Sequence, residues 1–170
     1  MRASVLSLAF LLFAGAAWAD DVRFPERNTP AFVIPVPGDW VASTDNDDNM
    51  QVSSRAKNVL LVLSIGPSAG SLDDFAAGML QSAGADPATR KEAATLAGHP
   101  GTLYYSTMSN STDPGGLRIA IRLTLTRPDA ATIASCALLI DASANDADIA
   151  TAQAVENAMT ITTAPPPPPQ

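Results

Sequence analysis

Residues 117–126 alternate between apolar and other side chains, and this alternation constrains the fold more than any other feature of the chain. Every second residue is Leu or Ile, and the residues between them are Arg, Ala and Thr. Successive side chains of a strand point to opposite faces of a sheet, so the pattern predicts a strand with one strongly apolar face. The opposite face, which carries Arg118, Arg122 and Thr124, is expected to tolerate an added charge.

A second long strand is predicted beyond a turn at residues 127–130. Nearly every residue from 133 to 140 is apolar, as is typical of a central strand covered on both faces. The two segments together predict a long antiparallel hairpin. Apolar runs between Gly, Pro and polar residues predict further strands at 31–34, 50–54, 58–65 and 92–96, then a turn at 98–101, a strand to residue 108 and a loop at 110–116.

Two amphipathic helices are also predicted. Ser71 is suited to accept hydrogen bonds from the first turn of one helix, and Gly84 is suited to end it. Its apolar stripe consists of Leu72, Phe75, Met79 and Ala83. The second helix is expected over residues 146–159, with an apolar stripe of Ile149, Ala152, Val155 and Met159.

These elements predict an α+β fold in which helices cover an antiparallel sheet. Their order, together with Phe32-Val33-Ile34-Pro35, Gly38-Asp39-Trp40 and the segments 71–75 and 96–101, resembles the PsbP-like superfamily. More narrowly, the chain is similar to bacterial envelope proteins of the DcrB type. The resemblance implies a PsbP-like α/β/α sandwich and a non-catalytic binding or assembly role. It supplies no catalytic residue.

The ends of the chain predict an exported protein. Residues 1–19 have the positive start, the apolar run and the small-x-small site of a cleaved signal peptide. Residues 20–163 are then expected to form a single PsbP-like α+β domain, and residues 164–170 a Pro-rich disordered tail. We therefore expect a periplasmic or secreted protein that has no membrane span after signal cleavage.

Charge and cysteine content exclude several classes of function. The formal net charge of -7 argues against nucleic acid as a partner. Cys136 is the single cysteine and His99 the single histidine, so neither a disulfide nor a structural zinc site is expected. The acidic loop at residues 45–49 has Met50 where a calcium loop of the EF-hand type needs Gly. No metal or other cofactor is predicted.

The segment at residues 66–70 matches the Gly-x-Ser-x-Gly pattern of a nucleophile elbow. Ser68, an acid such as Asp73 or Asp86, and His99 occur in the order used by serine hydrolases. However, Ser71 begins the helix later than an elbow requires, and His99 belongs to a predicted turn. A Gly/Pro/Ser turn is therefore the favoured interpretation, and a small serine hydrolase using Ser68 and His99 is the alternative.

Arg118 and Arg122 share the predicted polar face and are candidates for binding an anion or an acidic partner. Cys136 lies in the apolar strand and is expected to be a buried residue with a raised pKa. The sequence thus favours a non-catalytic protein that binds an unknown envelope protein or small molecule at a sheet edge or between sheet and helix. A further alternative is an envelope inhibitor whose acidic surface meets a basic target protein.

Overall fold

The computed structural model describes residues 18–109, 116 and 118–165, and these form ten strands and two helices. The predicted α+β class is confirmed. The strands are β1 Trp18–Phe24, β2 Ala31–Pro37, β3 Val41–Thr44, β4 Met50–Ser53, β5 Val59–Pro67, β6 Arg90–Leu96, β7 His99–Ser109, β8 Arg118–Asp129, β9 Thr132–Ile140 and β10 Thr160–Thr162. The helices are α1 Leu72–Ser82 and α2 Asp146–Ala158.

The larger sheet has seven strands in the order β3-β4-β5-β9-β8-β7-β6, and all of its described pairs are antiparallel. β9 lies at its centre and pairs with β5 on one side and with β8 on the other. The predicted hairpin of β8 and β9 is confirmed. Its turn is shorter than predicted, because β8 continues to Asp129, whose carboxylate accepts a hydrogen bond from the Ala131 amide at 2.8 Å.

A separate sheet of three strands, in the order β1-β2-β10, was not predicted. β2 does not end before Pro35 but continues through Pro37. Proline is tolerated there because β10 pairs only with the stretch from Ala31 to Val33, which leaves that side of β2 without a described neighbour farther along. The short β1 and β10 have polar residues and little periodicity, so only their pairing with β2 identifies them as strands.

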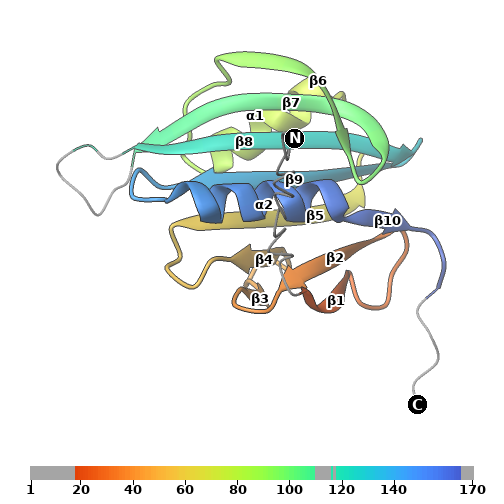
Figure 1. The fold of residues 1–170 in the computed structure, drawn as a ribbon. Helices are drawn as coiled ribbons and strands as arrows, with labels where there is room; N and C mark the ends of the chain where they lie inside the picture. The colour runs from red at the N-terminus through yellow and green to blue at the C-terminus, as the bar shows by residue number, and fades with distance from the viewer. Residues whose placement is uncertain (1–17, 110–115, 117, 166–170) are drawn as a thin grey trace, which may run out of the picture.

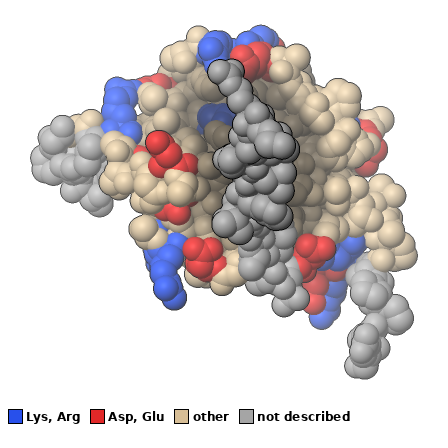
Figure 2. Space-filling model, viewed as in Figure 1, with Lys and Arg blue, Asp and Glu red and all other residues tan. Residues whose placement is uncertain are grey.

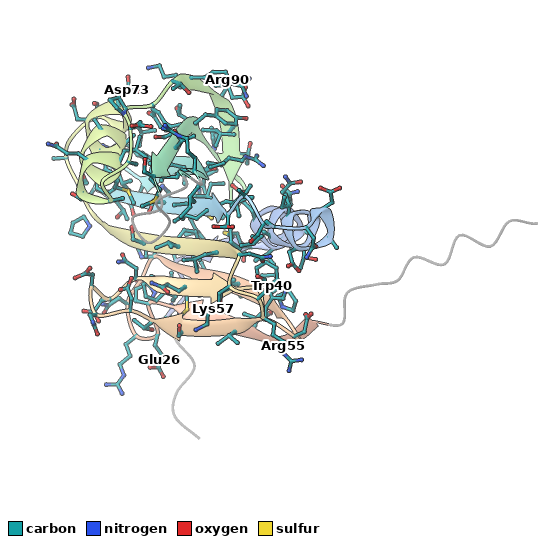
Figure 3. All side chains as sticks on the ribbon, turned by 90° about the vertical axis from the view of Figure 1, so that its left-hand side faces the viewer. Glu26, Trp40, Arg55, Lys57, Asp73 and Arg90 are labelled. Carbon is teal, nitrogen blue, oxygen red and sulfur yellow. The ribbon has the colours of Figure 1, made fainter. Side chains whose placement is uncertain are left out.

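The two faces of the larger sheet are covered by different layers, with α2 in front of it and α1 behind it in Figure 1. α1 packs Ala76 and Leu80 onto Tyr104, Ile121, Leu123, Leu125 and Ile133. On the other face, α2 and the small sheet share a core with β4, β5 and β9, and this core includes Trp40. Figure 3 shows the helices on opposite sides of the sheet.

The face of β8 opposite its apolar residues is more buried than predicted. Thr124 is 2% exposed, Thr126 is 0% exposed and Arg122 is half-buried. The prediction was wrong because β8 lies inside the sheet and Glu156 of α2 accepts a hydrogen bond from the Thr124 hydroxyl at 2.8 Å. Thr126 donates to the Pro100 carbonyl at 2.6 Å, so these buried hydroxyls are satisfied.

Both helices start and end largely as predicted. Ser71 accepts a hydrogen bond from the Asp74 amide, and Gly84 follows α1 with a φ of +68° that favours glycine. The fully buried residues of α1 are Ala76 and Leu80, whereas the predicted Phe75 and Met79 are half-buried. In α2, Ala152, Val155 and the following Met159 are buried, which confirms the predicted stripe at these positions.

The turn expected at residues 98–101 lies instead at Ala97 and Gly98, which both have positive φ, and His99 already pairs with Leu96. Residues 1–17 of the predicted signal peptide, residues 110–115 of the predicted loop and residues 166–170 of the predicted tail lie outside the described residues. Neither described helix is long and apolar enough to cross a membrane.

Replacing Ile121 with Asp tests the assignment of faces along β8. Ile121 is 4% exposed in the core beneath α1, so Ile121→Asp should destabilise the protein by roughly 3–5 kcal/mol, because it buries a charge without a partner. Ala120, the exposed neighbour on the other face, provides the control, and Ala120→Asp should change stability by less than about 0.5 kcal/mol. Chemical denaturation of both variants measures this difference, and equal losses would contradict the assignment.

Candidate functional site

A groove of about 830 Å³ lies between α1 and the edge strand β6. One wall is α1, the other is the connection from α1 to β6, and Tyr104 of β7 contributes from the sheet. The volume is within the range of pockets that hold small molecules, roughly 300–1,000 Å³. The groove therefore corresponds to the predicted binding position between sheet and helix.

Small side chains keep this groove open. Ala77 and Gly84 on the helix side and Ala85, Pro87 and Ala88 on the connection line it. The connection is held away from α1, because the Asp86 amide donates to the Thr107 carbonyl at 2.9 Å and the Thr89 amide donates to the Tyr105 carbonyl at 2.9 Å. A mainly apolar surface, accessible from solvent, is left between the two walls.

A cluster of three polar side chains lies at the lining of the groove. Asp73 is in the first turn of α1, where the helix dipole favours a carboxylate. Its two oxygens accept hydrogen bonds from the Tyr104 hydroxyl and the Lys91 ammonium, both at 2.7 Å. Lys91 and Tyr104 are direct cross-strand partners, so β6 and β7 present both donors to the same carboxylate. Figure 3 shows Asp73 on the side of the sheet that carries α1.

The cluster shifts the pKa values of two of its members. The hydrogen bond from Lys91, followed by that from Tyr104, lowers the pKa of Asp73. Burial, followed by the hydrogen bond to Asp73, raises the pKa of Tyr104 to about 12. At neutral pH the cluster therefore presents a charged Asp73 carboxylate and a neutral Tyr104 phenol, which can hold a polar group by hydrogen bonds.

A second arrangement lies on the other face of the sheet, where Arg90, Tyr105 and Arg122 occupy paired positions on β6, β7 and β8. The Arg90 guanidinium lies 4.0 Å from the centre of the Tyr105 ring, a cation–π contact. Tyr105 donates its hydroxyl to Glu92 at 2.6 Å. The buried Nε of Arg122 has no hydrogen-bond partner among the described residues.

Arg118 and Arg122, which were predicted together as ligand-binding residues, have different surroundings. Arg118 forms an ion pair with Asp86 and donates to the Thr107 hydroxyl at 2.6 Å. This pair is half exposed and tethers the connection that precedes β6. Arg122 contributes to none of the ion pairs of the described residues. Of the two arginines, Arg122 is thus the one with an Nε that lacks an acceptor among the described residues.

The structure does not bring Ser68 and His99 together. The Ser68 amide donates to the Ala131 carbonyl at 2.8 Å, and the Ser68 carbonyl accepts from Arg127 at 3.0 Å, so the segment is bound to the β8–β9 turn. β9 and β8 separate β5, which Ser68 follows, from β7, which His99 begins. Three inter-strand steps correspond to about 14 Å, which is beyond hydrogen-bonding reach.

Two other features considered in the sequence, Cys136 and the acidic loop that contains Asp45, are held by contacts within the fold. Cys136 is fully buried on β9, and burial raises the pKa of its thiol, as predicted. Asp45 accepts hydrogen bonds from the amides of Asp47 and Asn49, both at 2.9 Å, and from Gln51 at 3.0 Å. Its carboxylate therefore orders the acidic loop. Throughout the part of the chain that the structure describes, no three His, Cys, Asp or Glu residues gather as a metal site would require.

Comparisons with known proteins show similarity of fold. No family model matches the sequence, and no curated protein matches it. The fold is similar to that of LpqN of Mycobacterium tuberculosis, described as involved in cell envelope biogenesis, with a TM-score of 0.56 and 17% identity. The match covers 84% of this chain and 89% of LpqN.

A second similar structure is a protein of Bacteroides thetaiotaomicron VPI-5482, with a TM-score of 0.51 and 11% identity. The match covers 77% of this chain but only 45% of the Bacteroides chain, so this chain spans less than half of that protein's length. At these identities the comparisons show a shared fold.

The residues that line the groove were not singled out together by the sequence. The sequence indicates Asp73 only as a possible acid of a serine hydrolase, and Lys91 and Tyr104 belong to no motif. Only the register of β6 against β7 places these two donors side by side. A lysine in an edge strand opposite a tyrosine is a signal that becomes visible once the hairpin register is known.

The raised pKa of Tyr104 gives a test of the cluster. Asp73→Asn should lower the pKa of Tyr104 from about 12 yet leave it above 10.0, because burial of the ring remains. Because folding raises the pKa of Tyr104, the protonated phenol adds to the free energy of unfolding. This contribution is fully present below pH 10.0 and is lost as the pH rises through about 12. Tyrosinate absorbance, with Tyr104→Phe subtracted, measures the pKa, and an unchanged value in Asp73→Asn would contradict the contact.

Proposed function

We propose that the protein is a non-catalytic binding protein of the cell envelope that holds its ligand in the groove between α1 and β6. The groove itself is the observation that carries this proposal, because it combines pocket-sized volume, small apolar walls and a polar cluster at its lining. Two further features support an envelope location. The first is the predicted signal peptide at residues 1–19, and the second is the fold shared with LpqN.

The lining indicates the chemistry of the ligand. Ala77, Ala85 and Pro87 provide apolar contact along the groove, and the ammonium of Lys91 retains donors beyond the one that it gives to Asp73. A ligand with an apolar body and one polar group that accepts hydrogen bonds fits this surface. We further propose that the domain is related to the PsbP-like and DcrB-type proteins that its sequence resembles, which would agree with a binding or assembly role.

Filling the groove tests where the ligand binds. The neutral apolar dye Nile red should bind saturably to the protein with an increase in fluorescence. Ala77→Trp, which places an indole in the groove, should weaken that binding by about tenfold or more. Ala150 is an exposed alanine of α2 outside the groove, so Ala150→Trp adds the same side chain as a matched control and should leave binding unchanged. Equal binding by both variants would overturn the groove as the site.

The non-catalytic part of the proposal has its own test. A fluorophosphonate probe reacts with the activated serine of hydrolases. We expect it to leave the purified protein unlabelled, because β9 and β8 separate β5, which Ser68 follows, from β7, which His99 begins. Stoichiometric labelling that disappears in Ser68→Ala would contradict the proposal and support the serine hydrolase alternative.

A further inference from the structure

The guanidinium of Arg122 differs from those of four other arginines, each of which has a partner within the fold. Arg23 donates to three backbone carbonyls, Arg127 donates to two, and Arg118 is paired with Asp86. Arg90 is stacked on Tyr105 and lies 3.6 Å from Glu92. Arg122 alone among these five has a buried Nε without an acceptor in the described part of the chain.

A buried N–H group without an acceptor is costly, and the cost is larger when the group is charged. Arg122 lies within a strand and is flanked by Tyr105 on β7 and Leu138 on β9, so the backbone holds its position on the sheet face. A side chain that lowers stability in this way can still be kept in a protein when it serves function, here by binding an acceptor that is not part of the chain.

The acids on the same face are already engaged with other donors. Glu156 of α2 accepts a hydrogen bond from the Thr124 hydroxyl at 2.8 Å. Glu92 accepts from the Tyr105 hydroxyl at 2.6 Å and lies beside Arg90. The described ion pairs do not include one between either of these acids and Arg122. The positive charge of Arg122 is therefore not neutralised by direct contact within the described residues.

The surroundings of Arg122 suit a small charged group. Arg90 provides a second cation on the same face, and Tyr105 lies between the two arginines in the cross-strand register. Figure 1 shows α2 in front of β5 and β9, and the β6–β7 hairpin at the opposite edge of the sheet from β3 and β4. Figure 2 shows acidic and basic side chains next to one another around the edge of the same face.

We propose that Arg122 is the anchor of an oxyanion-binding site on the α2 side of the sheet, with Arg90 as a second cation. The ligand would carry a carboxylate or a phosphate, because both offer paired oxygens that match the fork of N–H donors of a guanidinium. Arg122 and Tyr105 lie on the face opposite the groove beneath α1, whereas Arg90, on the edge strand β6, also lines that groove. The anchor of the proposed site, Arg122, is thus separate from the groove.

Nuclear magnetic resonance of the arginine Nε–Hε groups tests the proposal directly in the wild-type protein. Inorganic phosphate and acetate are titrated separately at constant ionic strength. The Nε–Hε signal of Arg122, assigned by its loss in Arg122→Lys, should shift saturably with at least one of the two anions. The anion that binds more tightly identifies whether the natural group is a phosphate or a carboxylate.

Arg55 provides the internal control, because it is an exposed arginine in the turn between β4 and β5 and is labelled at a distance from Arg90 in Figure 3. Its signal should show no saturation. Arg90→Gln should weaken the binding measured at Arg122, by about tenfold for one charged hydrogen bond, whereas Arg55→Gln should not. An Arg122 signal that does not saturate with either anion would overturn the proposal, whether or not the variants fold.

Discussion

The pairing of β9 on both of its edges is the constraint on which the rest of the structure depends. β5 and β8 pair with it along nearly its whole length, so its backbone groups are satisfied inside the sheet. Its side chains alternate between the two cores, with Ile133 beneath α1 and Ala134, Cys136 and Leu138 beneath α2 and the small sheet. Apolar residues on both faces of one central strand thus require a covering layer on each side.

The two covering layers are held differently. α2 packs Ala152, Val155 and Met159 into the larger core, which also contains residues of the small sheet. α1 is attached by a narrow stripe of Ala76 and Leu80, and hollows lie on both of its sides. One is the groove beside β6, and the other, of about 560 Å³, lies against the loop that contains Asp47 and Asn49. The groove exists because α1 covers only part of its face of the sheet.

Local sequence signals predicted the parts of the fold that depend on local chemistry. The alternation in β8, the apolar run of β9 and the Ser71 cap each act within a few neighbouring residues, and these elements were located correctly. The prediction failed where distant segments decide the outcome. β1 and β10 become strands only by pairing with β2, and the exposure of Arg122 depends on which strands and helices lie beside β8.

For the candidate sites, too, the sequence predicted residue types, whereas the fold decides which residues lie together. The sequence identified Arg122 by its residue type, but only the fold distinguishes it from the paired Arg118. The order of Ser68 and His99 along the chain also suggested a serine hydrolase as an alternative, but the strand order of the sheet separates the two residues. The cluster of Asp73, Lys91 and Tyr104 joins a helix to two strands of a hairpin, so it could not be predicted before the register was known.

The central claim is that β9 is the best-satisfied element of the fold, whereas α1 is attached to the sheet by a narrow buried stripe beside the groove. Native-state hydrogen exchange, followed amide by amide across a series of low denaturant concentrations, measures this most directly. We expect the β9 amides to exchange only through global unfolding and the α1 amides to exchange faster, through a local opening with little dependence on denaturant. Equal protection and equal denaturant dependence for α1 and β9 would contradict the account.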